Sequence, residues 1–213
     1  MKLIGQKLQI RVYETNGAVT SYDQNDPGLA RAILESFDPE QVFNQETLVI
    51  TDKGSHSTFP VSQIARIDFT SESNPPLAFR GEMVEAMELT KVQFEALIRN
   101  PIMGAQWQRA NSADKSIVVF LEVSLAGGES LLLTMDIEFR SFPNFNEIRE
   151  HLLQRSGLCL RLQEGGVAVI NLANLTRLTF FPGSTDSPGN AWPASFSQRD
   201  AAAVKDRRHA TAS

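Results

Sequence analysis

Few residues in this chain combine a type and a spacing that could support catalysis. The sequence holds three histidines (His56, His151 and His209) and one cysteine, Cys159, and none of them is spaced like the metal ligands of a helix or turn. Cys159 follows a predicted helix that carries His151, and an imidazole beside a thiol can generate a nucleophilic thiolate. However, Cys159 stands within an apolar strand pattern, and free cysteines are among the most buried residue types. We therefore expect Cys159 to pack in a core, and we assign no catalytic residue and no metal ligand.

The remaining polar motifs favour structural roles over cofactor binding. Ser55-His56-Ser57 lies in a glycine-containing turn with no acid that could orient the histidine. The chain contains neither Gly-x-x-x-x-Gly-Lys nor Gly-x-Gly-x-x-Gly, so no phosphate-binding loop is predicted. Asp26 closes a short acidic stretch, but it stands just before Pro27-Gly28, where its side chain would cap a helix. No cofactor is expected.

One pair of arginines, Arg66 and Arg177, stands at matching positions of two similar segments. Two guanidinium groups related by a repeat could contact an anionic ligand from two sides. Each arginine could equally be the polar position of a short alternating strand. Arg66 and Arg177 are therefore the candidate ligand-binding residues, and the structural role is kept as the alternative.

The offset in numbering between Arg66 and Arg177 also relates longer segments. In each copy a strand pattern runs into a hairpin turn, at Asn16-Gly17 and at Gly127-Gly128. Both dipeptides supply the positive φ angles that a tight hairpin turn needs. The sequence therefore predicts an internal duplication. The matched segments are Leu8–Val12 with Val119–Val123, and Val61–Phe69 with Leu172–Phe180.

Each copy is predicted to run strand–strand–helix–strand–strand–strand. The helices begin at a proline in the first turn, Pro27 in the first copy and Pro143 in the second. The fold class is therefore α+β and β-rich, with two related small sheet modules and a connecting helix. The closing pattern is similar to that of partly open, barrel-like folds and of pleckstrin-like modules, a likeness of fold from which no function follows.

The segment between the copies contains one helix with a clear start. Thr90 and Gln93 form a capping box, and Pro101 ends the helix, which is expected at about residues 91–99. The tail has a low hydrophobicity that predicts disorder. Its aromatic residues, Trp192 and Phe196, are either a short docking motif or incidental. The predicted organisation is a first β-rich repeat (1–75), a connecting segment (76–112), a second β-rich repeat (113–183) and the tail (184–213).

The second predicted hairpin is apolar on both faces. Ile117–Leu121 and Leu131-Leu132-Leu133 are continuous apolar runs, whereas the strand at 18–23 in the first copy is half polar. A continuous run is typical of a strand that is covered on both faces. The cover could be the 91–99 helix, the first copy or a second molecule, and an uncovered face would be an interface. Leu131, Leu132 and Leu133 are therefore candidate interface residues, together with Trp192 and Phe196.

Charge and composition restrict the partners. The net charge is -5, from 20 Lys and Arg against 25 Asp and Glu, and nucleic-acid binding needs clustered cations that this chain lacks. No apolar run approaches the roughly 20 residues of a membrane-spanning helix. A single cysteine cannot form an internal disulfide, which favours a reducing, cytoplasmic location. These features argue against nucleic-acid and membrane partners.

We therefore expect a non-catalytic interaction or regulatory protein that binds a protein partner or associates with itself. The alternative is a small-ligand-binding module whose site lies between the two repeats. A further alternative is an enzyme with an unrecognised site of scattered carboxylates and serines.

Overall fold

The computed structural model describes residues 7–39, 41–52, 54–71, 86–99, 116–138, 145–181 and 191–192. We call residues 7–71 the first half and residues 116–181 the second half. Among the described residues, the helices are α1 (Pro27–Ser36), α2 (Lys91–Ile98) and α4 (Phe145–Gln154), and the short 3-10 turns are η1 (Val42–Asn44), η2 (Val61–Gln63) and η3 (Leu172–Asn174). The strands are β1 (Leu8–Glu14), β2 (Val19–Gln24), β3 (Thr47–Asp52), β4 (Ser55–Pro60), β5 (Ile64–Ser71), β6 (Ala86–Glu88), β7 (Ser116–Leu125), β8 (Ser130–Glu138), β9 (Gly157–Arg161), β10 (Val167–Asn171) and β11 (Leu175–Phe181).

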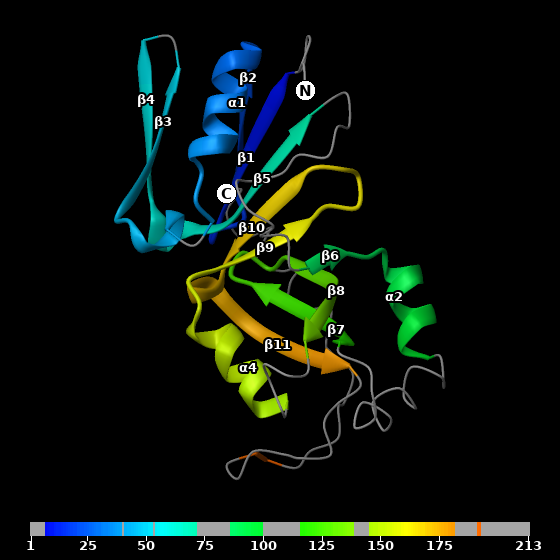
Figure 1. Ribbon diagram of the computed structural model, residues 1–213. Coiled ribbons are helices and arrows are strands. Elements are labelled where there is room, and N and C mark those ends of the chain that lie inside the picture. Colours follow the sequence, from blue (N-terminus) through cyan, green and yellow to red (C-terminus); the bar gives the residue numbers. More distant parts are fainter. Residues whose placement is uncertain are drawn as a thin grey trace, which may run out of the picture.

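Nine of these strands form one mixed sheet in the order β11-β7-β8-β6-β9-β10-β5-β1-β2. Its neighbours pair antiparallel except β6 and β9, which are parallel. β3 and β4 form a separate two-stranded hairpin, which stands at the side of the first half near α1 (Figure 1). The expected β-rich α+β fold is confirmed, and the sheet is not a closed barrel because β11 and β2 stand at its two ends.

The strand registers of the two halves agree at the offset that separates Arg66 from Arg177. β1 pairs with β2 and β5 as β7 pairs with β8 and β11, and each three-stranded unit has a register shift at the matched place. The backbone hydrogen bonds that close the turns are matched as well. In the first half, the Thr15 amide donates to the Gln63 carbonyl, and in the second half the Ala126 amide donates to the Asn174 carbonyl.

The two hairpin turns lie against each other. Gly17 and Gly127 have φ angles of +88° and +96°, which confirms the predicted turns. A Cβ atom added at Gly127 would lie 3.0 Å from the Glu14 carbonyl oxygen, across the junction between the halves. The β1–β2 turn and the β7–β8 turn therefore touch backbone to backbone.

The hairpins that follow the helices are placed differently in the two halves. β9 and β10 lie inside the large sheet, with β6 on one side and β5 on the other. The matching hairpin of the first half, β3–β4, pairs with no other described strand. The pairing of β10 with β5 joins the halves into one sheet, so the second half continues the sheet of the first.

The β9–β10 hairpin contributes to two cores. Leu158 and Ile170 belong to the cluster of the second half, whereas Cys159 and Val169 belong to the cluster of the first half. Each of these side chains is 2% exposed or less. The burial of Cys159 confirms its predicted packing role. One face of the β9–β10 hairpin therefore packs in the core of the first half, and the other face packs in the core of the second half.

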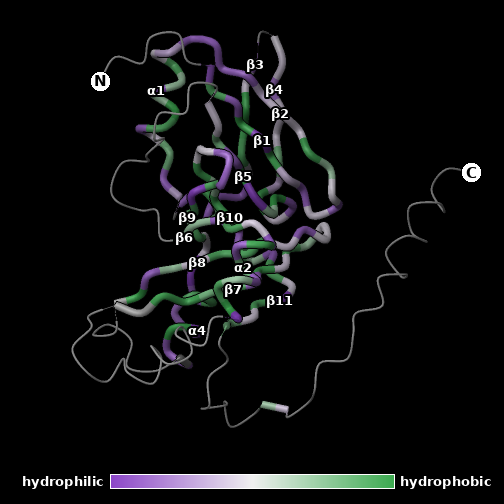
Figure 2. Tube along the Cα trace, turned by 90° about the vertical axis from the view of Figure 1, so that its right-hand side faces the viewer, coloured by the Kyte–Doolittle hydropathy of each residue, from purple (hydrophilic) through white to green (hydrophobic). Residues whose placement is uncertain are grey.

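The helix starts predicted at Asp26-Pro27 and at Thr90 are found in the structure, whereas the start predicted at Pro143 lies outside the described residues. The Asp26 carboxylate accepts hydrogen bonds from the amides of Gly28 and Leu29 at the start of α1. Thr90 and Gln93 form the capping box of α2. In Figure 2, α1 alternates between hydrophobic and hydrophilic stretches, as a helix with one wet face should. None of the described helices is long and apolar enough to cross a membrane.

The expectation that both strands of the second hairpin are covered on both faces is correct for β7 and wrong for β8. Phe120 and Leu121, on opposite faces of β7, are 1% and 0% exposed. In β8, burial alternates instead, with Leu132 only half-buried. The cover on the Phe120 face of β7 is α2, because Phe94 of α2 packs its ring edge-on against Phe120 of β7 and Phe181 of β11.

Candidate functional site

Arg66 lies in a buried ionic cluster at the junction of the halves. Its guanidinium donates to both carboxylate oxygens of Asp68, at 2.5 and 2.8 Å, and to Glu129 Oε1 at 2.5 Å. Arg66 and Asp68 are 5% and 2% exposed, and the ring of Tyr13 lies 4.9 Å from the guanidinium carbon. Because Glu129 belongs to the β7–β8 turn, the cluster links the two halves.

The local electrostatics reflect this burial. Burial raises the pKa of the Glu129 carboxyl, and the nearby charge of Asp68 adds to the rise while that of Arg66 opposes it. Burial also raises the pKa of the Tyr13 hydroxyl, again with a contribution from Asp68. Because Arg66 pairs with Asp68 on its own strand and with Glu129 of the second half, it acts as a tie between the halves.

Arg177, at the matched position on β11, has different partners. It forms an ion pair with Glu122 on the neighbouring strand β7, and both side chains are partly exposed. Five strands separate β5 from β11 in the sheet order. A pocket of about 290 Å³ does lie between the two hairpin turns, and Tyr13 and Glu129 line it, but neither arginine does.

The other sequence candidates have varied surroundings. Leu131 and Leu133 are 4% and 0% exposed in the core of the second half, whereas Leu132 is half-buried and its carbonyl accepts a hydrogen bond from the Leu89 amide. Trp192 is 93% exposed. Phe196 lies outside the described residues. Within the described ranges, no three His, Cys, Asp or Glu side chains gather as metal ligands.

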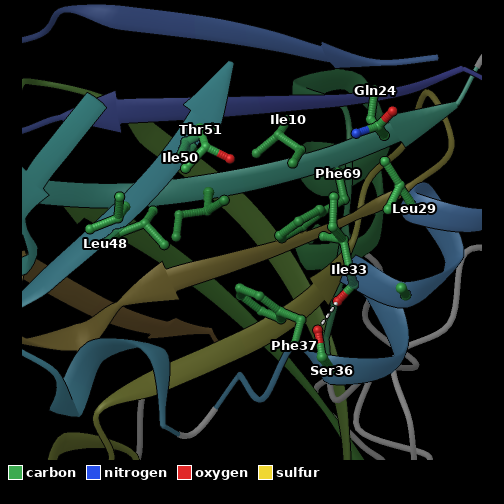
Figure 3. Close-up of a pocket in the computed structure, with 13 residues that line it drawn as sticks. Ile10, Gln24, Leu29, Ile33, Ser36, Phe37, Leu48, Ile50, Thr51 and Phe69 are labelled. Atoms are coloured by element: carbon green, nitrogen blue, oxygen red, sulfur yellow. Dashed lines mark hydrogen bonds between the residues drawn. The ribbon is translucent and has the colours of Figure 1, made fainter. Parts of the chain in front are cut away.

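An apolar groove of about 510 Å³ opens on the first half, between α1 and β3. Its floor is the face of the large sheet, formed by Ile10, Ile67 and Phe69. In Figure 3, the side chains from β3 and those from α1 lie on opposite sides of the groove. The polar groups at its rim include Gln24 at the end of β2. The wall residues are Leu29, Ala32, Ile33 and Ser36 from α1, Phe37 at its C-cap, and Leu48, Val49, Ile50 and Thr51 from β3.

The groove exposes apolar surface that the second half buries. Leu48 and Ile50 of β3 are only half-buried, whereas Leu158 and Leu160, which take the matching places on β9 by strand pairing, are 1% and 0% exposed. On α1, Leu29 is 56% exposed although it lies on the helix face that lines the groove. A shared pattern of side chains therefore produces a filled interior in one half and an open one in the other.

Sequence reasoning did not find this groove, although the chain carries a signal for it. α1 follows β2 closely, whereas α4 ends just before β9 begins. The two helices therefore stand at different places along the segment that joins the second and third strands of their halves. Comparisons of the chain with protein-family models, with curated proteins and with solved structures found no match.

Proposed function

We propose that this chain is a non-catalytic interaction protein that holds an apolar segment of a partner protein in the groove between α1 and β3. The observation that carries the proposal is the open, apolar groove, with Leu29 and Val49 at 56% and 51% exposed. Exposed apolar surface that is concave and rimmed by polar residues is typical of binding sites. Burial of a leucine side chain contributes roughly 1.5–3 kcal/mol, so each apolar side chain of a partner that enters the groove would add to the affinity.

We further propose that the two halves are copies of one module, of which the second became the scaffold and the first kept an open interior. The matched registers and turn hydrogen bonds support a common origin. The ion pair between Arg66 and Glu129 supports a fixed position of one copy relative to the other. In this arrangement the sheet of the second half holds the floor of the groove in place.

The proposal is tested by selecting binders from a library of random peptides against the full-length chain. We expect peptides that bind the wild type and lose about tenfold or more in affinity to Leu29→Asp, because a charge then faces the apolar groove. The matched control is Leu153→Asp, which changes a leucine of similar exposure, 52%, on α4. This residue does not line the groove, so the control should bind like the wild type.

Two results would overturn the proposal. One is a library that yields no binder to the wild type, and the other is a set of binders that Leu29→Asp and Leu153→Asp weaken equally. Circular dichroism of both variants shows whether each is folded before binding is compared.

A small apolar ligand is the second candidate occupant, because the groove volume of about 510 Å³ is in the range of small-molecule sites. Native mass spectrometry of the purified chain separates the two. A retained small molecule that Leu29→Asp releases and Leu153→Asp keeps would favour the ligand, whereas bare protein that gains mass only with selected peptides favours the segment.

A further inference from the structure

A short strand from the connecting segment closes the interior of the second half. β6 pairs antiparallel with β8 and parallel with β9, so that Ala86 lies opposite Met135 on one side and Leu160 on the other. Ala86 is 3% exposed and belongs to the core of the second half. The next residue, Met87, points the other way and is 49% exposed.

The matched place in the first half lies between β2 and β3. By register, Met135 corresponds to Gln24, because Met135 lies opposite Val119 just as Gln24 lies opposite the matched residue Leu8. In the same way Leu160 corresponds to Ile50, since these residues lie opposite the matched pair Ala168 and Ser57. Gln24 and Ile50 both line the groove. The position that Ala86 fills in the second half is therefore part of the open groove in the first.

Within the described part of the chain, neither flanking strand has a second strand partner. β2 pairs only with β1, and β3 pairs only with β4. Unpaired backbone groups along a strand edge are a ready template for another strand. Between these two edges, the side chains of Ile10 and Phe69 face the groove, as Leu121 and Phe180 face the core of the second half.

We propose, resting on the function proposed above, that the groove takes its partner as an added β-strand between β2 and β3. The strand runs antiparallel to β2 and parallel to β3, as β6 runs between β8 and β9. Its recognition signature is a small apolar residue placed between Gln24 and Ile50, followed by an outward residue of any type. Main-chain hydrogen bonds supply affinity in this mode, and the inward side chain supplies specificity.

The probe is a blocked synthetic peptide with the sequence of residues 84–90, Val-Glu-Ala-Met-Glu-Leu-Thr, added to the isotope-labelled full-length chain. We expect chemical-shift changes on α1, β2 and β3, and slower hydrogen exchange of edge amides in β2 and β3. A peptide with Ala86→Asp should bind about tenfold or more weakly, because the charge would enter the apolar interior. A peptide with Met87→Asp should bind within about twofold, because that side chain points outward.

Backbone methylation tests the strand itself. A peptide that is N-methylated at an inter-strand hydrogen-bonding position keeps its side chains and loses a donor, and it should bind about fivefold more weakly or worse. Equal binding of the Ala86→Asp and Met87→Asp peptides would overturn the inference. Shift changes on β8 and β9 would overturn it too, because they would mean exchange with β6 rather than binding to the first half. So would the absence of any shift change at about 1 mM peptide.

These outcomes separate the inference from the function on which it rests. If library peptides bind the groove and are sensitive to Leu29→Asp, but neither they nor the β6 peptide respond to N-methylation, the interaction function stands and the strand mode is wrong. If no library peptide and no β6 peptide binds, both are wrong.

Discussion

At the scale of single residues, the two arginines at matched positions have different surroundings. Arg66 is buried and holds two carboxylates, one of them from the other half, whereas Arg177 is partly exposed and pairs with one carboxylate of its own half. Removing one member of a buried ion pair leaves an uncompensated charge, which costs far more than losing a surface pair. The two arginines should therefore contribute different amounts to the free energy of unfolding, although they stand at matching positions in the sequence.

We expect Arg66→Met to lower the free energy of unfolding by about 3–5 kcal/mol, because Asp68 then stays buried without its partner. The matched control, Arg177→Met, should cost about 1 kcal/mol or less. Urea unfolding of the two variants and the wild type measures both values.

A double variant completes this test. Arg66→Met combined with Asp68→Leu removes the two most deeply buried charges and leaves Glu129, whose side chain is 31% exposed, so it should recover most of the loss. Equal losses for Arg66→Met and Arg177→Met would show that the Arg66 cluster is not a tie between the halves.

At the scale of elements, local signals determined what the sequence could predict. The hairpin turns, the Asp26 cap and the capping box of α2 depend on residues close together in the chain, and all three are found as predicted. The Arg66–Glu129 bond and the β10–β5 pairing, by contrast, join segments that are far apart in the chain. No local pattern specifies such partners, so neither the sheet order nor the open groove could be predicted.

The contact between the two hairpin turns gives an element-scale prediction. Gly127→Ala places a Cβ atom 3.0 Å from the Glu14 carbonyl oxygen, whereas a Cβ atom at Gly128 has no neighbour within 4 Å. Both residues have positive φ, so each substitution costs about 1–2 kcal/mol of backbone strain. Gly127→Ala should cost at least about 1 kcal/mol more, because the turn of the other half must move.

Thermal and urea unfolding of the two alanine variants measure this difference. Gly128→Ala serves as the control for backbone strain alone. The same loss in both variants would mean that the turns do not support each other.

At the scale of the whole molecule, one sheet and two shared cores predict a single unfolding transition. Cys159, from the second half, packs in the core of the first half and is 2% exposed. Its thiol should therefore react with a disulfide reagent only when the whole chain unfolds. The free energy from labelling rates should equal the global value from circular dichroism, with the same urea dependence.

The control is Val92→Cys in a Cys159→Ala background, because Val92 is 78% exposed on α2 and its replacement should label as a free thiol. The labelling rate of Cys159 can be compared with the rate expected if the thiol reacts only after global unfolding. A measured rate more than about tenfold higher would show that the β9–β10 hairpin opens by itself.

The shared hairpin also has a consequence for synthesis on the ribosome. The core of the first half includes side chains from β9 and β10, and these strands are translated long after β5. At roughly 5–20 residues per second, the nascent N-terminal strands wait some 5–20 s for the strands that complete them. During that interval the face of Leu8, Ile67 and Phe69 lacks its cover. The strands of the first half are thus expected to need protection, such as a chaperone gives, until β9 and β10 have left the ribosome.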